Sequence, residues 1–290
     1  MTLDQLRIFV AVAEREHVTQ AAAHLNLTQS ATSAAIAALE ERHDVQLFDR
    51  VGRRIVLTDA GKLFLNEARA VLARAEQATR LLGDLAGMKR GTLRLAASQT
   101  IANYWLPPLM QRFHRAHPGI VLELAVGNTA EVVQMVDAAT VDLGVVEGEV
   151  TDETLAIDSL PGDRLALVVA PGHEWAHRPP SGPEDLKRTS WVMREVGSGT
   201  RAVCEKALAE YGLRVEDIDV AFELPSNEAV RVAVESGAGA AILSTLVVER
   251  AVDAGRLVVS AFDLPPRQFR VLRHKGRHLS LAEQRFLDLV

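Results

Sequence analysis

The feature that most constrains the fold is a pair of short helical patterns separated by a two-residue turn. The first pattern covers residues 18–25 and is rich in alanine, with Thr19 as its expected N-cap. Asn26 is a residue type that often ends a helix, and only one further residue precedes the second pattern. Two helices joined this tightly predict a helix-turn-helix, a unit that either contacts DNA or serves as a plain packing hairpin.

The second pattern, residues 28–39, has the features of a helix that contacts DNA. Thr28 is placed to cap it, because its hydroxyl can accept a hydrogen bond from a free backbone N–H of the first turn. Ile36 and Leu39 lie three residues apart and should anchor the opposite face in a core. The exposed first turns carry uncharged side chains that can read base edges, namely Gln29, Ser30 and Ser33. Contacts to the phosphates of the DNA backbone are expected from Thr19, Gln20 and Thr28.

The flanking segments complete a small domain. Residues 2–5 match a capping box ahead of an apolar stripe, which predicts a first helix. Residues 45–50 and 54–57 predict two short strands around Gly52, the pattern of a β-wing. Arginines crowd the tip of this wing, where they are placed to contact phosphates or a minor groove: Arg50, Arg53 and Arg54. A solvated basic hairpin is the plainer alternative.

The net charge of −6 is unevenly distributed along the chain. Residues 1–90 hold 12 Lys and Arg against 11 Asp and Glu, whereas residues 91–290 hold 20 against 27. The acidic excess therefore lies outside the expected DNA-binding part. A single copy of that part should bind DNA weakly, because phosphate contacts dominate non-specific affinity. This favours binding as a dimer.

A long helix is expected from Thr58-Asp59 to about residue 85. Apolar side chains recur along it at alternating spacings of four and three, a 3.5-residue repeat over three heptads that is typical of a coiled coil. The seam consists of Phe64, Ala68, Val71, Ala75, Ala78, Leu82 and Leu85. We expect this helix to pair with its copy in a second chain. The alternative, a helix lying on its own domain, is disfavoured because the stripe is narrow.

From residue 91 onward, strand patterns alternate with helical ones, which predicts an α/β fold with a mainly parallel sheet. One series runs from residue 92 to 146 and a second begins at 165. The single cysteine, Cys204, permits no intrachain disulfide and fits a reducing compartment. No apolar run approaches the roughly 20 residues that span a bilayer, and no basic leader precedes an apolar stretch. These features predict a cytoplasmic protein.

Taken together, the segments resemble LysR-type transcriptional regulators over essentially the whole chain. The resemblance is carried by residues 9–14, 19–22, 27–33, 47–50, 57–61 and a glycine-rich turn at 236–243. Many members carry one or two arginines just after the serine that corresponds to Ser33, whereas this chain has Ala34 and Ala35. Helix-to-phosphate contacts should then be fewer, and the wing arginines correspondingly more important.

The resemblance implies an α/β protein with an all-α-plus-wing N-terminal head. It implies a winged helix-turn-helix at residues 1–58, a dimerising linker helix at 59–90 and an effector-binding domain at 91–290. That domain would resemble periplasmic binding proteins, with lobe I at about 91–161 and 267–290 and lobe II at about 162–266. Two strands crossing between the lobes are expected near 158–164 and 264–269. The implied partners are double-stranded DNA, a small-molecule effector and further copies of the chain, as a homodimer and usually a homotetramer.

Two hydroxyl-rich turns stand before helices, one in each expected lobe, at residues 98–100 and 198–201. Helix N-termini offer free N–H groups and a positive dipole end, which suit anions. The resemblance adds residues 128–129 and 226–227. Plain N-capping is the alternative for each turn. The effector contacts predicted in this way are Ser98, Gln99, Thr100, Asn128, Thr129, Glu147, Ser198, Gly199, Thr200, Ser226 and Asn227.

The stretches 98–107 and 196–201 look most like the sulfur-anion-responsive branch of the family, which suggests sulfite, sulfate or a similar oxyanion as effector. Glu147 and Glu228 argue in part against an anion, because an unpaired carboxylate repels it. An amino acid or aromatic acid therefore stays an alternative. No cofactor or metal is expected.

Two other classes of protein fit the sequence less well. An enzyme carried by the α/β portion is disfavoured, since the chain holds no Gly-x-Ser-x-Gly, HExxH or P-loop motif. The spacings His114/His117 and His173/His177 suit metal ligands, but their sequence context favours solvated surface histidines. A ligand-binding transport protein would leave residues 1–90 unexplained.

Replacing Gln29 with alanine should relax the preference for the target sequence, because each lost base contact removes about 1–3 kcal/mol of discrimination. Arg53→Ala is the contrasting variant: it should weaken binding to all sequences alike and flatten the salt dependence. Genome-wide selection of bound DNA compares the two. An unchanged target preference in Gln29→Ala would show that residues 28–39 do not read the bases.

Overall fold

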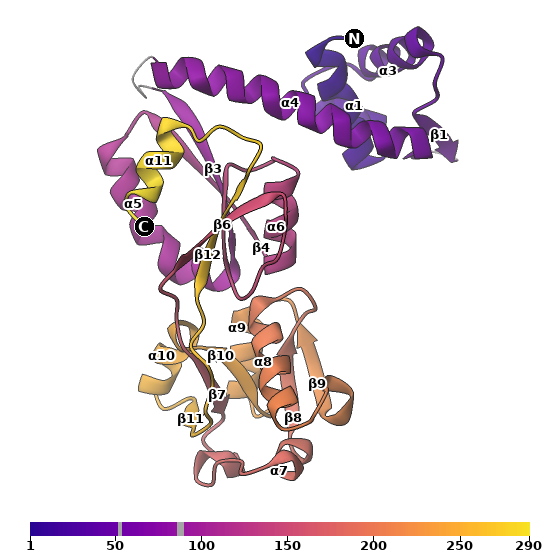
Figure 1. Cartoon of the computed structure of the whole chain (residues 1–290). Helices are drawn as coiled ribbons and strands as arrows, with labels where there is room; N and C mark the ends of the chain where they lie inside the picture. The colour runs from indigo at the N-terminus through magenta and orange to yellow at the C-terminus, as the bar shows by residue number, and fades with distance from the viewer. Residues whose placement is uncertain (52–53, 86–89) are drawn as a thin grey trace. The chain divides into compact units, whose positions relative to one another are not determined.

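The computed structural model describes residues 1–51, 54–85 and 90–290. The chain divides into two compact units, residues 1–85 and 86–290 (Figure 1). The first unit contains the predicted head and the long helix. Its elements are α1 (Leu3–Arg15), α2 (Val18–His24), α3 (Gln29–His43), β1 (Phe48–Val51), β2 (Arg54–Leu57) and α4 (Asp59–Leu85).

The two helices of the helix-turn-helix form where the sequence places them, with one corrected cap. The helix α2 begins at Val18, so Thr19 lies inside its first turn and cannot cap it. His17 is the N-cap, and its Nδ1 accepts the Gln20 N–H at 3.5 Å. Asn26 adopts the left-handed conformation expected of a helix stop, with φ of 54°. Thr28 caps α3 as predicted and accepts the Ala31 N–H at 3.2 Å.

One apolar core joins the helices of the head to the wing. The predicted anchors Ile36 and Leu39 are both buried in it. The Phe9 ring lies at the centre, 5.3 Å from the ring of Phe48 and 4.9 Å from that of Phe64. The core therefore fixes α3 against α1. The first turns of α3 carry Gln29, Ser30 and Ser33 on the side of the helix that faces away from this core.

The helix α4 divides its apolar stripe between two environments. Ala68 is buried and Phe64 half-buried against the head, and Arg69 binds Glu14 at 2.9 Å. The prediction that the whole stripe pairs with a second chain is therefore wrong for Phe64 and Ala68, because the core of their own head covers them. Beyond that point Ala75 is half-buried, Ala78 is exposed, and Val71 and Leu82 are 42% and 68% exposed. Their pairing across a dimer stays a prediction, and the Leu85 side chain lies outside the described part.

A carboxylate links α3 to the wing. One oxygen of Glu40 accepts the backbone N–H groups of Leu47 and Phe48, at 2.7 and 3.1 Å. β1 starts at Phe48, three residues later than predicted, and Glu40 binds the backbone at that start. Arg53 and the side chains of Arg50 and Arg54 lie outside the described residues, so their predicted contact with DNA stays a prediction.

In the second unit, lobe I has a five-stranded sheet of order β4-β3-β5-β12-β6 (Figure 1). The helices that cover it come from the first part of this unit and from its last part. The elements are β3 (Gly91–Ser98), the π-helix η1 (Ile101–Trp105), α5 (Leu106–Ala116), β4 (Ile120–Gly127), α6 (Thr129–Asp137), β5 (Leu143–Glu147), β6 (Leu155–Leu160), β12 (Phe269–His274) and α11 (Leu281–Leu287).

Lobe II is built from two small sheets, of order β10-β7-β11 and β8-β9. A bridge between Trp191 and Ala240 joins them, with the Val192 N–H donating to the Ala240 carbonyl at 2.9 Å. The elements are β7 (Leu165–Val169), η2 (Glu174–Ala176), α7 (Pro183–Arg188), β8 (Ser190–Arg194), α8 (Gly199–Glu210), η3 (Val215–Asp217), β9 (Asp219–Leu224), α9 (Asn227–Glu235), β10 (Ala241–Ser244), α10 (Thr245–Asp253) and β11 (Val258–Ser260).

The strand pairing corrects the prediction of a mainly parallel sheet, because the lobe I sheet is mixed and lobe II has one antiparallel and one parallel sheet. In lobe I β12 runs antiparallel to both neighbours, and in lobe II β7 does the same. The chain enters both strands directly from the other lobe. Each strand therefore starts at the end of the sheet opposite to the one where its neighbours start.

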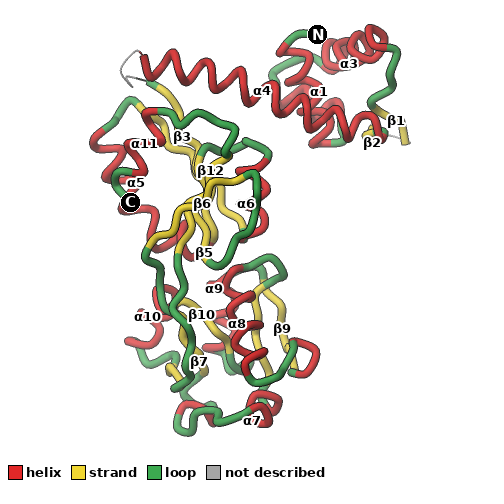
Figure 2. Tube along the Cα trace, viewed as in Figure 1, coloured by secondary structure: helices red, strands yellow, loops and turns green. Residues whose placement is uncertain are grey.

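Two segments carry the chain between the lobes, residues 161–164 and 261–268, close to the predicted positions (Figure 2). They touch, since the Arg267 N–H donates to the Asp163 carbonyl at 3.2 Å. A Cβ at Gly162 would overlap the backbone of Arg267, so only glycine allows this approach.

Cys204 is buried in the core of lobe II, where desolvation raises the pKa of its thiol to about 12. It is a packing residue, as its sequence context predicts. Among the described helices, none is long and apolar enough to cross a membrane.

Replacing Glu40 with alanine should expose the backbone N–H groups of Leu47 and Phe48. Hydrogen bonds to a charged acceptor contribute about 1.5–3 kcal/mol, so exchange of these amides should accelerate at least about 10-fold. Hydrogen exchange with mass spectrometry over residues 44–57 measures this. Glu41→Ala is the matched control, because Glu41 is exposed next to it. Equal exchange in the two variants would contradict the role of Glu40.

Candidate functional site

Polar side chains from both lobes meet where the lobes face each other. From lobe I come Ser98 at the end of β3, Thr100 two residues later and Glu147 at the end of β5. Lobe II supplies Thr200 in the first turn of α8 and Asn227 at the start of α9. All five are buried. The structure thus brings the two predicted turns together, because each follows the carboxyl end of a strand.

Glu147 is at the centre of the lobe I contribution and is 2% exposed. Its carboxylate accepts hydrogen bonds from the Ser98 and Thr100 hydroxyls, the second at 3.3 Å. Its backbone carbonyl accepts the Thr129 hydroxyl at 3.1 Å. The Arg267 guanidinium lies 3.6 Å from one carboxylate oxygen. Glu147 therefore links the residues at the ends of β3 and β4 to the crossing segment that carries Arg267.

Arg267 is a buried residue that the sequence analysis missed. Its guanidinium donates to both oxygens of Asp163, at 2.6 and 2.7 Å, and to the Thr200 hydroxyl at 3.0 Å. Asp163 also accepts the Ser244 hydroxyl. The available signal was an arginine directly after Pro265-Pro266, within an expected crossing segment.

Arg194 is the second buried guanidinium, and it was missed as well. It is the last residue of β8. Two of its nitrogens, Nε and Nη2, bind the two carboxylate oxygens of Glu195 at 2.7 and 2.8 Å, and Nη1 donates to the Asn227 side-chain oxygen. A charged residue at the carboxyl end of a buried strand was the signal that could have identified it.

Gln99 and Asn227 bind the lobes directly to each other. The Asn227 N–H donates to the Gln99 side-chain oxygen at 3.1 Å, and the Gln99 amide donates to the Pro225 carbonyl at 2.6 Å. The Asn227 side chain also donates to the Thr100 hydroxyl at 3.0 Å. The predicted effector residues therefore pair across the boundary, and the domain is closed.

The remaining predicted contacts line the edge of this cluster, and three of them act as helix caps. Asn128, Ser198 and Ser226 accept backbone N–H groups at the starts of α6, α8 and α9. The plain capping alternative thus holds for them, whereas Ser98 and Thr100 cap no helix and bind Glu147 instead. A Cβ at Gly199 would overlap the carbonyl oxygen of Glu147, so a glycine is required for the lobes to approach this closely.

The charges of the cluster are unequal. Burial raises the pKa of Glu147, and the charge of Arg267 offsets this only in part. Burial also tends to raise the pKa of Glu195, but the hydrogen bonds and charge of Arg194 outweigh it, so the pKa of Glu195 is lowered. Glu147 and Asp163 share one guanidinium, which favours the neutral form of Glu147.

Glu228 is not an unpaired carboxylate, contrary to the concern raised by the sequence. It binds Arg231 at 2.8 Å and accepts the Tyr104 hydroxyl from lobe I. Partial burial and this bond raise the pKa of Tyr104 to about 12. Glu228 therefore serves as a contact between the lobes.

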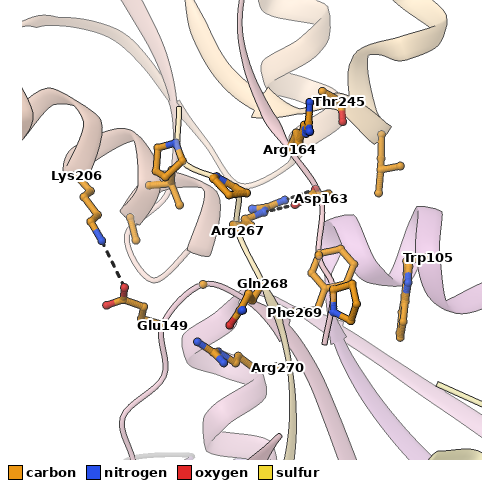
Figure 3. A pocket seen from close by; sticks show the side chains of 18 residues that line it. Trp105, Glu149, Asp163, Arg164, Lys206, Thr245, Arg267, Gln268, Phe269 and Arg270 are labelled. Atoms are coloured by element: carbon orange, nitrogen blue, oxygen red, sulfur yellow. Dashed lines mark hydrogen bonds and ion pairs between the residues drawn. The ribbon is translucent and has the colours of Figure 1, made fainter. Parts of the chain in front are cut away.

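Two hollows flank the closed cluster. One, of about 430 Å³, lies between α6 and α8 and includes Thr129, Glu147 and residues 196–199. The other, of about 840 Å³, lies against the crossing segments. Figure 3 shows the Arg267–Asp163 pair at its centre, and a Lys206–Glu149 ion pair of 3.4 Å between the lobes at one side. Of the predicted contacts, only Glu147, Thr129, Ser198 and Gly199 reach the smaller hollow.

Of the histidines with ligand-like spacing, His114 and His177 are exposed, and His117 and His173 are half-buried. Within the described residues, no group of three or more His, Cys, Asp and Glu is placed to hold a metal ion. His173 instead caps η2 and bonds the Thr189 hydroxyl at 2.8 Å.

A winged helix-turn-helix with a long helix, followed by two α/β lobes that close on buried polar residues, defines a ligand-responsive DNA-binding protein. Two family models match. Bacterial regulatory helix-turn-helix proteins of the lysR family match residues 3–62, and the LysR substrate binding domain matches residues 86–290. The chain belongs to the LysR family of transcriptional regulators. It is a DNA-binding regulator with an effector-binding domain, and not an enzyme.

Individual relatives agree with this assignment. The chain is 38% identical over 291 residues to the uncharacterized HTH-type transcriptional regulator YeiE of Escherichia coli strain K12, covering 99% of this chain and 96% of that protein. Full-length CbnR complexed with its target DNA has a similar fold, with a TM-score of 0.69 at 22% identity over 100% of this chain and 99% of that one. The Synechocystis PCC6803 CcmR regulatory domain, in complex with 2-PG, matches at a TM-score of 0.62 and 27% identity, covering 69% of this chain and 95% of that one.

Replacing Glu147 with glutamine should remove a dependence of stability on pH. Because the pKa of Glu147 is raised in the folded domain, the folded state retains a proton that the unfolded chain loses above about pH 4.3. The wild type should therefore lose stability relative to Glu147→Gln as the pH rises from 5 to 8.

Urea unfolding followed by tryptophan fluorescence measures this difference, since Trp105, Trp175 and Trp191 all lie in the effector-binding domain. Glu149→Gln is the control, because the Glu149 side chain is 84% exposed. A stability difference that does not change with pH would contradict the burial of a proton at Glu147.

Proposed function

We propose that this regulator is switched by a small oxyanion, of the sulfite or sulfate kind, that binds between the two lobes. The observation that carries the proposal is the pair of buried guanidinium groups, Arg194 and Arg267, within the polar cluster. Buried arginines present planar sets of N–H donors that match oxyanions.

Hydroxyl and amide groups around these arginines suit the same ligand. Ser98, Thr100 and Asn227 all offer donors to an oxyanion once the lobes separate, and each is now bonded within the protein. The first turn of α8 adds free backbone N–H groups and a positive dipole end. The neutral form of Glu147, which burial favours, removes one source of repulsion.

An amine-bearing effector is the second candidate, and Glu147 is the observation that favours it. Glu147 and Asp163 both pair with the Arg267 guanidinium. A cationic group of the effector beside Glu147 would give Glu147 a positive partner of its own. Amino acids belong to this class. Aromatic acids are a third candidate, and 2-PG is a fourth, because the CcmR domain is described in complex with it.

The effector would act on DNA binding through the arrangement of the oligomer. We propose a homodimer formed by the exposed part of the α4 stripe, around Val71, Ala78 and Leu82, and a homotetramer built from two such dimers. Binding between the lobes shifts the balance between closed and open domains, and thereby the placement of the two heads on their half-sites.

Thermal shift and calorimetric titration of the full chain at constant ionic strength test the effector class. Sulfite or sulfate should stabilise the protein, whereas matched chloride should not. Thr100→Val should weaken binding about 10-fold, because it removes a buried hydroxyl. Thr140→Val is the control on an exposed residue. Stabilisation by an amino acid and by no oxyanion would replace the first candidate with the second.

A further inference from the structure

The two buried arginines differ in how firmly they hold their carboxylates. Asp163, the partner of Arg267, has a side chain that is 3% exposed and accepts a further bond from Ser244. Glu195, the partner of Arg194, has a side chain that is 21% exposed while that of Arg194 is 2% exposed. Water can therefore take up the Glu195 carboxylate if it leaves, whereas Asp163 has no such exit. Only the Arg194 pair is exchangeable.

Arg194 would stay in place without Glu195. Its Nη1 donates to Asn227, which is itself held by Thr100 and Gln99 from lobe I. The backbone carbonyl of Arg194 accepts the Arg201 guanidinium at 3.0 Å. Within the described residues, the Nε and Nη2 atoms bond only to Glu195, so its departure would leave a preorganised pair of parallel donors in a buried place. A buried unpaired charge is unfavourable, and another anion must take that position.

We infer that Glu195 is an internal substitute for the effector, and that the bound oxyanion displaces it from the Nε and Nη2 atoms of Arg194. This rests on the proposed function, and it names the anchor of the anion. Two oxygens of a sulfite, sulfate or carboxylate group match the same two donors that the Glu195 carboxylate now occupies. The exchange of one anion for another leaves the charge next to Arg194 nearly unchanged, which limits its desolvation penalty.

The displacement would also change the contact between the lobes. The Asn128 side chain of lobe I is among the groups that lower the pKa of Glu195. The adjacent Gly197 carbonyl accepts the Ala130 N–H at 3.2 Å, and Gly197 has a φ of 91° that favours glycine. Because Glu195 lies two residues before Gly197, its release would alter this contact between α6 and the loop before α8. Anion binding at Arg194 is in this way coupled to the position of one lobe on the other.

Calorimetric titration of the full chain with sulfite and with sulfate tests the inference. Glu195→Gln should tighten binding about 10-fold, because the competing carboxylate is gone. Glu205→Gln is the matched control: it removes the same charge from Arg201 nearby and should change the affinity less than 2-fold. Arg194→Lys should weaken binding at least about 10-fold in both backgrounds, since an ammonium cannot offer two parallel N–H donors.

The outcomes separate the inference from the proposed function. If the wild type binds an oxyanion and Glu195→Gln binds it no more tightly than Glu205→Gln, the displacement is overturned and the proposed function stands. If neither the wild type nor Glu195→Gln binds an oxyanion, both are overturned, because the freed donors of Arg194 should then accept one. Should Glu195→Gln fold poorly, Glu195→Asp provides the same test, since the shorter side chain keeps the charge but cannot reach both donors.

Discussion

The closed state of the effector-binding domain depends on one guanidinium that two carboxylates share. Arg267 lies in one crossing segment and Asp163 in the other, while Glu147 comes from lobe I and Thr200 from lobe II. Breaking such a buried group by removing one partner costs about 3–5 kcal/mol, because a charge is left without compensation. This group therefore holds the two crossing segments to each other and, in the closed state, to both lobes.

Around this fixed centre the protein arranges groups that can change partners. Gln99 of lobe I bonds to Asn227 of lobe II, and Arg194 bonds to Asn227 and Glu195 within lobe II. Polar contacts of this kind are lost and replaced at little net cost when water or a ligand supplies equivalent bonds. The Arg267–Asp163 ion pair holds the crossing segments together while the outer pairs exchange partners. The lobes can then move relative to each other without unfolding.

Local patterns were sufficient to predict most of the fold. Periodicity located the helices of the head and the alternating strands and helices of both lobes, because local hydrogen bonding and burial of one face determine them. The error at Thr19 arose because either of two neighbouring polar residues could cap α2, and the imidazole of His17 does so. The antiparallel β7 and β12 were missed because strand direction depends on where the chain enters the sheet, which no local pattern records.

The candidate site was predicted only in part, for a related reason. Ser98, Thr100 and Asn227 stand at strand ends before helices, a position that a pattern can identify. Arg194 and Arg267 are single charged residues whose burial follows from the closure of the lobes, and charged residues are usually exposed. Stripe residues such as Phe64 show the converse limit, since an apolar repeat does not say which surface covers it.

The place of β12 in its sheet has a consequence for how the chain folds during synthesis. This strand is made only after lobe II, yet it lies inside the sheet of lobe I, between β5 and β6. Lobe II is one continuous stretch, so it can form while the last part of lobe I is still being made. β6 pairs only with β12 in the described sheet, so lobe I stays open until β12 arrives. A compact lobe II shortens the loop that must then close, which reduces the entropy lost in joining its ends.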